Sequence, residues 1–246
     1  YNSWSPKLYF SRRRLAMLDD NKLADITFRV VDGKRQKQIL MQANSTLVLL
    51  EAPNMKHLMP KGNNNNDENG APNETIRILD TKPAHFRAFL KFVYSDSVSF
   101  MRGDKQLADL QAMLRIASNF GCWRLKLKIE AKISDEYLTN ENAISLLEFA
   151  HSNKCFMLKE ACLTVAQVPV LNKFLLEECS SRCNQDPALI QEIRQYLSGE
   201  YWDDGVNDNF SKMCVGELYG AIETEQKKAA FDSDLSRAEL LELVRK

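Results

Sequence analysis

The sequence feature that most constrains the fold is a long region of helical periodicity that begins at Pro83. Through residues 83–178, apolar side chains recur at spacings of three and four positions, which is the period of helices that bury one face. Segments with the two-residue period of strands come before this region and are few. We therefore expect the α+β class, with a small sheet near the start of the chain and an all-α region behind it.

Three short strands are predicted ahead of the helical region. Apolar residues alternate with polar ones through residues 26–30, as in a half-buried strand. Asp32 and Gly33 then form a strong hairpin signal, which places a second short strand around residues 34–37. A third strand is predicted at residues 75–79.

Short helices are predicted around these strands. Residues 10–22 run from basic to apolar to acidic, and Leu15 and Leu18 share one face at a three-residue spacing. Residues 39–59 are predicted to form two short helices, broken in the middle and bent by Pro53. The cluster Arg12-Arg13-Arg14 is interpreted as the solvated face of the first helix rather than as a phosphate contact or localisation signal.

Boundary residues mark the later helices. Gly121 ends a helix that starts near residue 107, as a C-cap glycine does. Thr139 is predicted to be the N-cap of a helix at residues 143–151. A further helix begins at Met157 and is predicted to end at Pro169.

Two polar segments interrupt the pattern. Residues 61–72 are rich in Asn and cannot bury enough apolar area to offset the entropy of ordering them, so a mobile surface loop is predicted. A second polar, acidic linker spans residues 199–209. It separates amphipathic stretches at residues 189–197 and 235–244.

Four segments in register carry a family resemblance. They are residues 23–30, where Asp25 precedes alternating apolar residues, the Ile-Leu-x-x-x-x-Ser pattern of residues 39–45, the Phe-x-x-x-Leu-x-Phe-Val-Tyr-Ser-Asp pattern of residues 86–96, and residues 107–119. Together they resemble a BTB/POZ domain, a small sheet flanked by helices. Residues 139–168, with the start Asn-Glu-Asn-Ala, resemble the first helical pair of a BACK domain.

The resemblance implies a domain organisation. The expected parts are an amino-terminal extension (1–10), a BTB/POZ domain with its mobile loop (11–134), a BACK-like helical domain (135–198), and a polar linker with a terminal helix (199–246).

The resemblance also implies where partners bind. The helix that carries Leu15 and Leu18 would pack across the two-fold axis of a homodimer, next to Asp25. A cullin would face the surface formed by the residues His57, Leu58, Met59 and Tyr94. The sequence also departs from the family pattern, since the usual His ahead of residue 39 is missing. At the expected cullin contact, Met59-Pro60-Lys61 lacks the Glu of the apolar-x-Glu element with which many BTB adaptors bind a cullin.

Two functions remain open at this point. The first is a dimeric protein–protein interaction module that serves as a substrate adaptor fragment for a cullin-3 RING ubiquitin ligase, with an unknown substrate held by a domain missing from the chain. The alternative is a BTB dimer that acts as a cullin-independent scaffold in transcriptional, cytoskeletal or channel assembly. The missing Glu favours the scaffold, and family frequency favours the adaptor.

An enzyme is not expected, because no constellation of catalytic residues is present. His151 and Cys155 could share a helix face, but a surface His beside a buried Cys is the expected interpretation. Cys179 and Cys183 lack a second pair for zinc, and the acidic residues 203–208 lack calcium-loop spacing. No catalytic residue, metal site or cofactor is therefore predicted.

Charge and cysteine use constrain the environment. Lys+Arg and Asp+Glu each total 33, so no whole-chain attraction to nucleic acid or to an anionic membrane is expected. The six cysteines lie mostly in helical patterns, as in a reduced protein. These features predict a cytoplasmic or nuclear location, or both.

Overall fold

The chain divides into two compact units, Tyr1–Ile129 and Glu130–Lys246. The computed structural model describes residues 6–20, 23–31, 38–59, 75–98, 107–181, 186–202, 209–224 and 235–245. The predictions of a hairpin turn and strand at residues 32–37, of a mobile loop at 61–72 and of a polar segment at 203–208 lie outside the described residues.

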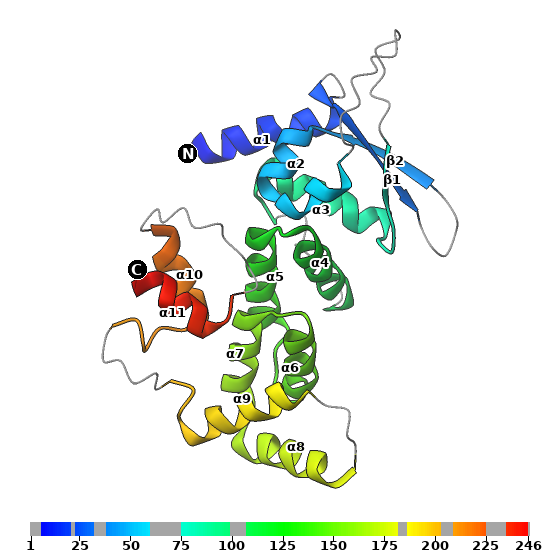
Figure 1. The fold of residues 1–246 in the computed structure, drawn as a ribbon. Helices are drawn as coiled ribbons and strands as arrows, with labels where there is room; N and C mark the ends of the chain where they lie inside the picture. The colour runs from blue at the N-terminus through cyan, green and yellow to red at the C-terminus, as the bar shows by residue number, and fades with distance from the viewer. Residues whose placement is uncertain are drawn as a thin grey trace, which may run out of the picture. The chain divides into compact units, whose positions relative to one another are not determined.

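A mixed three-stranded sheet organises the first unit (Figure 1). Its central strand β1 (Ile26–Val31) pairs antiparallel with β2 (Gln38–Ala43) and parallel with β3 (Thr75–Ile78). The alternation that predicted β1 is visible in its burial, since Phe28 and Val30 are fully buried and Arg29 between them is half-exposed. The helices that surround this sheet and follow it confirm the predicted α+β class.

Strand β2 corrects a prediction, because residues 39–43 were expected to be helical. Met41 and Ala43 are buried and oppose Phe28 and Ile26 of β1, whereas Leu40 is exposed. A short apolar run such as Ile-Leu-Met has no period of its own, so its neighbours decide its conformation. Here pairing with β1 places Met41 and Ala43 in the core while the backbone hydrogen bonds are made across the strands.

Six helices of the described chain begin in the first unit: α1 (Pro6–Asp19), α2 (Ser45–Glu51), the 3-10 helix η2 (Pro53–Leu58), α3 (Pro83–Ser95), α4 (Leu107–Phe120) and α5 (Trp123–Glu136). Helix α1 is longer than predicted and starts within the segment expected to be an extension. Pro53 and Pro83 occupy first turns, where a missing N–H does no harm. Gly121 has φ +70° and ends α4 as predicted.

Aromatic side chains form the core between the sheet and α3. Phe28 of β1 meets Phe86 edge to face at 5.0 Å between ring centroids, and Phe120 of α4 lies 5.2 Å from Phe89. Phe28, Phe86 and Phe89 are fully buried. Aromatic pairs at these distances add about 0.5–1.5 kcal/mol beyond the area that they bury.

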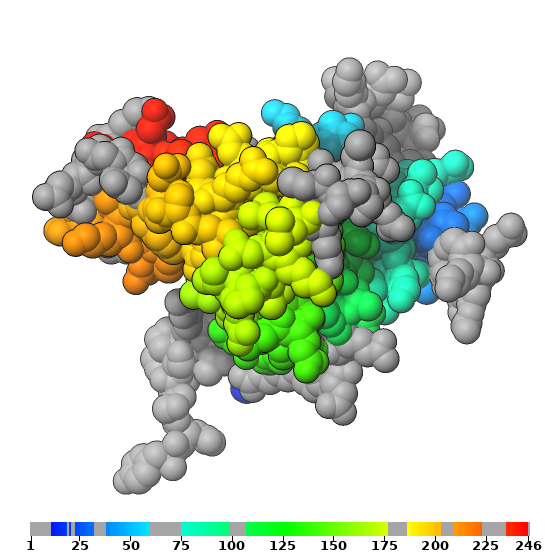
Figure 2. Space-filling model, turned by 90° about the horizontal axis from the view of Figure 1, so that it is seen from below, coloured from blue at the N-terminus to red at the C-terminus, as the bar shows by residue number. Residues whose placement is uncertain are grey.

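The second unit is helical in the part described, with α6 (Ala143–Ser152), α7 (Phe156–Val165), α8 (Val168–Ser181), α9 (Pro187–Ser198), α10 (Val215–Thr224) and α11 (Arg237–Arg245). The amphipathic stretches at 189–197 and 235–244 are confirmed as α9 and α11. In the space-filling view α9 (yellow) lies beside α8 (yellow-green) (Figure 2).

Two boundaries in the second unit differ from prediction. Helix α7 ends at Val165, and Pro169 lies in the first turn of α8 instead of ending α7. Asn142, not Thr139, is the N-cap of α6, and its Oδ1 accepts a hydrogen bond from the Thr139 N–H at 2.9 Å. Thr139 therefore belongs to the turn before the helix. Pro169 was predicted to end α7 but lies at the start of the next helix. Thr139 was predicted to be the N-cap but lies before it.

Buried carboxylates connect the helices of this unit. Glu130 of α5 accepts the Leu158 N–H at the start of α7, at 3.0 Å. Glu160 of α7 accepts the Val215 N–H at the start of α10, at 2.7 Å. Because the first N–H groups of a helix have no partner within it, each carboxylate satisfies one of them and fixes one helix against another.

Candidate interaction surfaces

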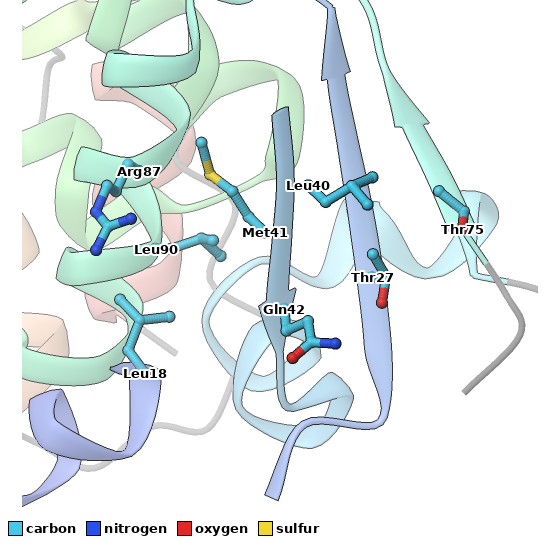
Figure 3. Close-up of a pocket in the computed structure, with 8 residues that line it drawn as sticks. All are labelled: Leu18, Thr27, Leu40, Met41, Gln42, Thr75, Arg87 and Leu90. Carbon is cyan, nitrogen blue, oxygen red and sulfur yellow. The ribbon is translucent and has the colours of Figure 1, made fainter. Parts of the chain in front are cut away.

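Helix α1 presents the leucines that were predicted to lie at a dimer interface. Leu15 and Leu18 are both half-buried, and α1 contacts α3. Leu18 lines a cavity of about 480 Å³ together with Met41 and Leu90, whose side chains lie on the same side of β2 (Figure 3). Within one chain, the leucine face of α1 therefore has apolar area that remains accessible to a partner.

Asp25 is engaged inside its own chain. Its carboxylate accepts the Ser45 N–H at 2.6 Å and the Ser45 hydroxyl at 2.5 Å. The neighbouring Asn44 is the N-cap of α2 and accepts the Leu47 N–H at 3.2 Å. Asp25 thus stabilises the first turn of α2 against the start of β1, a role that favours an acidic residue at a helix N-terminus.

Tyr94 is not part of an exposed surface, which corrects its placement on the cullin-facing side. Its side chain is only 2% exposed, and its hydroxyl accepts the Asn44 N–H at 2.7 Å. Burial raises the pKa of the phenol above its ordinary value. The sequence located Tyr94 near the end of α3, but the aromatic ring points to the N-cap of α2 rather than to solvent.

The other three residues of the predicted cullin-facing surface lie together at the end of η2. His57 is exposed, and Leu58 and Met59 are half-buried. Met55, earlier in η2, is fully buried and anchors this helical turn. The arrangement leaves a short apolar ridge with one imidazole beside it.

A charged cluster at the end of α3 escaped the sequence interpretation. Asp96 has φ +52°, and its carboxylate lies 2.6 Å from Nη2 of Arg124 and 2.9 Å from Nζ of Lys128. Lys128 also donates to the Asp96 carbonyl at 2.8 Å. The available signal was that the family pattern has Gly where this chain has Asp96. A non-glycine residue in the left-handed region is strained, and the two cations of α5 compensate for it.

The side chains weighed for catalysis are placed in structural roles. His151 contacts Asp186 at 3.0 Å, and Cys155 is buried at the start of α7. Burial raises the pKa of Cys122 and of Cys162 to about 12, so these thiols stay protonated at neutral pH. No group of three or more potential metal ligands occurs among the described residues, and the side chains of Cys179 and Cys183 lie outside them.

Comparison with known families identifies the class. The model of the BTB/POZ domain family matches residues 15–137, half of the chain, and the chain belongs to that family. The matched region contains the mixed sheet, α2, η2 and α3 to α5. BTB domains are non-catalytic protein-interaction modules, and this chain therefore carries such a module.

A curated relative extends the similarity beyond that domain. The chain is 27% identical over 186 residues to the BTB/POZ and MATH domain-containing protein 3 of Arabidopsis thaliana. The match covers 72% of this chain and 43% of the relative, so the chain spans less than half of that protein's length. None of the described helices is both long and apolar enough to cross a bilayer.

Proposed function

We propose that the chain is a dimeric substrate-adaptor fragment for a cullin-3 RING ubiquitin ligase. The observation that carries the proposal is the pair of separate apolar surfaces on one BTB domain. The leucine face of α1 serves self-association, and the ridge of His57, Leu58 and Met59 serves the cullin. The chemistry is assigned to the ligase, and this chain is assigned to binding.

The dimer is proposed from the half-buried state of Leu15 and Leu18. A symmetric dimer would bury the same leucine face on both copies and complete the cavity lined by Leu18. Light scattering on the unaltered chain at micromolar concentration is expected to give twice the monomer mass. Changing both leucines to Asp should give a monomer, because two charges would enter a desolvated interface.

The matched control for this change is Ala16→Asp, which places one charge on the exposed face of the same helix. It should leave the dimer intact. A monomeric unaltered chain rejects the dimer, and dissociation by Ala16→Asp would show that charge on α1, rather than loss of the leucine face, separates the copies.

Cullin binding is proposed at the ridge of η2. Interfaces concentrate their energy in a few apolar anchors, and truncation of such an anchor costs about 2 kcal/mol or more. Because Lys61 replaces the usual Glu, binding should be weaker than in adaptors that keep it, but still measurable. Calorimetric titration with the amino-terminal domain of cullin-3 is expected to show binding to the unaltered chain and a loss of at least about tenfold with Met59→Asp.

Leu79→Asp provides the matched control, since Leu79 is 65% exposed and follows β3 rather than η2. It should bind cullin-3 as the unaltered chain does. Equal binding by Met59→Asp and the unaltered chain places the contact on another face. Absence of binding by the unaltered chain rejects the adaptor.

In that last case the alternative function takes its place, a BTB dimer that acts as a cullin-independent scaffold in transcriptional, cytoskeletal or channel assembly. Lys61 favours it, because a cation stands where the cullin-binding element has a carboxylate.

The region that follows the BTB domain is proposed to be a BACK-like helical domain at residues 135–198. Its support is the α6–α7 pair, with Asn142 of the Asn-Glu-Asn-Ala start at the N-cap position of α6. Residues 199–246 then add a polar linker and the terminal α11. The compact units divide at Ile129, inside α5 and close to this proposed boundary.

Substrate recognition is assigned to a domain outside these 246 residues. The Arabidopsis relative is named for a MATH domain as well as a BTB/POZ domain, and this chain matches less than half of it. A cytoplasmic or nuclear location is proposed with the adaptor, in accord with the free cysteines Cys122, Cys155, Cys162 and Cys214 among the described residues.

A further inference from the structure

The outer face of the sheet carries all of its charge in one row. The three strands contain two charged side chains, Arg29 of β1 and Arg77 of β3. The strand register places them directly opposite each other, with Leu40 of β2 on the other side of Arg29. The next row along the face is uncharged and consists of Gln42, Thr27 and Thr75.

This row has no internal electrostatic compensation. Neighbouring strands lie about 4.8 Å apart, and like charges on side chains directly opposite each other across them repel. Among the described residues neither Arg29 nor Arg77 has a carboxylate partner, and Nε of Arg29 is buried without a hydrogen-bond acceptor. The buried Nε–H of Arg29 is out of reach of a docked partner, but the accessible part of its guanidinium and the exposed guanidinium of Arg77 can each bind a carboxylate.

Apolar area accompanies the charges. Leu40 is 62% exposed and, in Figure 3, lies on the side of β2 opposite to Met41 and Leu90. Arg77 is exposed as well, and Val31 at the end of β1 is half-buried. A partner that fits this face must therefore offer carboxylates to the arginines and an apolar side chain to Leu40.

We propose that the sheet face of Arg29, Arg77 and Leu40 is a docking surface for an acidic protein segment. Charge complementarity selects the partner, because two guanidinium groups side by side suit carboxylate oxygens, and Leu40 suits an apolar residue next to them. The surface is distinct from the ridge of η2, and it adjoins the leucine face of α1, because Leu40 and Leu18 line the same cavity. The assignment does not depend on cullin binding.

The test is fluorescence anisotropy with a short labelled peptide of alternating Glu and Val, compared with one of alternating Gln and Val. The Glu peptide should bind, and its affinity should fall as salt rises. The double change Arg29→Gln with Arg77→Gln should reduce affinity by at least about tenfold. Leu40→Ser should reduce it by a few-fold, about the effect of losing one exposed apolar contact.

The matched control is the double change Arg194→Gln with Lys212→Gln, which removes the same charge from exposed sites of the second unit. It should bind the Glu peptide normally. If Arg29→Gln disturbs folding, as judged by circular dichroism, Arg77→Gln alone serves, because Arg77 is exposed, and it should still cost several-fold in affinity.

Three results overturn the proposal. One is equal binding of both peptides by the unaltered chain. Another is equal loss of affinity in the arginine variant and the control variant, which would indicate general attraction only. The third is a labelled DNA oligonucleotide that binds through Arg29 and Arg77 when the Glu peptide does not, since the surface would then serve nucleic acid.

Discussion

The two units of the chain differ in how many charged side chains their apolar interiors contain. In the first unit the sheet and α3 are joined by a cluster of phenylalanines, with Phe28 and Phe86 in contact at its centre. The second unit also has an apolar interior, but among the described residues it buries more charged side chains than the first unit, where Lys126 is the counterpart; Glu160 and Arg237 are 4% and 8% exposed. Arg237 lies 5.1 Å from the Trp202 ring and donates to the Met213 carbonyl at 3.2 Å.

The difference matters for specificity and for pH. Apolar packing depends on volume and tolerates some rearrangement, whereas a buried charge demands one set of partners and is costly when a partner is lost. Cavities should therefore be the main response to core substitution in the first unit. In the second unit, unpaired groups and changes in proton binding should add to them.

The largest effect is expected from Phe86→Ala. The ring contacts Phe28, Phe89 and Phe120, so its removal leaves a cavity and should cost about 3–5 kcal/mol of unfolding free energy. Urea unfolding measures the total, and hydrogen exchange should show the loss in β1 and α3 but not in α7. Exposed Leu79→Ala should stay within about 0.5 kcal/mol. An equal loss of hydrogen-exchange protection in both units would show that the two interiors do not respond independently.

Glu160→Ala should come next, at about 2–4 kcal/mol, because it leaves the buried Val215 N–H unpaired and removes a carboxylate that interacts with Arg237. Hydrogen exchange should place the loss at the start of α10. Exposed Glu200→Ala is the matched control and should have little effect. An equal loss from Glu200→Ala would mean that Glu160 has no special role.

Glu160→Gln separates the charge of Glu160 from its hydrogen bond, since the amide oxygen can still accept the Val215 N–H. Burial is the main cause that raises the pKa of Glu160 above its ordinary 4.5. The group therefore favours folding fully below the ordinary value, and this contribution is lost as pH rises through the raised pKa. Urea unfolding as a function of pH should show that loss in the unaltered chain and a smaller one in Glu160→Gln. Identical pH profiles would remove Glu160 as the cause.

Each unit has a glycine with a positive φ angle, and the two differ in how much space surrounds them. Gly121 has φ +70°, and an added Cβ would lie 2.7 Å from Cγ of Asn54 in η2, whereas Gly199 has φ +84° and open space. Gly199→Ala should cost about 1 kcal/mol from backbone strain alone, and Gly121→Ala about 1–2 kcal/mol. Repeating Gly121→Ala in an Asn54→Ala background should recover the difference. Equal costs in thermal unfolding would show that Asn54 simply moves aside.

The smallest effect is expected from Asp186→Asn. The Ala188 N–H and the His151 ring lower the pKa of Asp186, so its contribution to stability is present above the ordinary value and is lost as pH falls through the lowered pKa. This is the opposite sign to Glu160. As pH falls, the melting temperature should decline less steeply in Asp186→Asn than in the unaltered chain. A steeper decline would mean that ionised Asp186 does not stabilise the fold.

Sequence periodicity was sufficient where one face of an element is buried against the core. It located β1 and β3, and it located α9 and α11, because their apolar spacings match the strand or helix period without competition. It failed for β2, where the hydrogen bonds of a neighbouring strand decided the conformation. It also missed α10, whose sequence has two glycines, Gly216 and Gly220, and whose start is stabilised by Glu160, 55 positions earlier.

The candidate surfaces were predicted less completely than the fold. A resemblance can place His57, Leu58 and Met59 in one segment, but it cannot tell which neighbouring side chains point inward. Tyr94 is buried because its hydroxyl meets the Asn44 N–H from α2, a contact between residues 50 positions apart. The row of Arg29 and Arg77 likewise depends on a strand register that no local pattern encodes.

The parallel pairing of β1 with β3 has a consequence for the order of folding. β1 and β2 are neighbours along the chain and can pair early. β3 pairs with β1 only after Thr27 and Thr75, 48 positions apart, come together. The rate of this step depends on closing the intervening chain, whose entropy changes by only about 0.6 kcal/mol per doubling of length. Evolution can therefore lengthen or shorten the segment between β2 and β3 with little kinetic penalty, while the hairpin remains the scaffold on which the last strand docks.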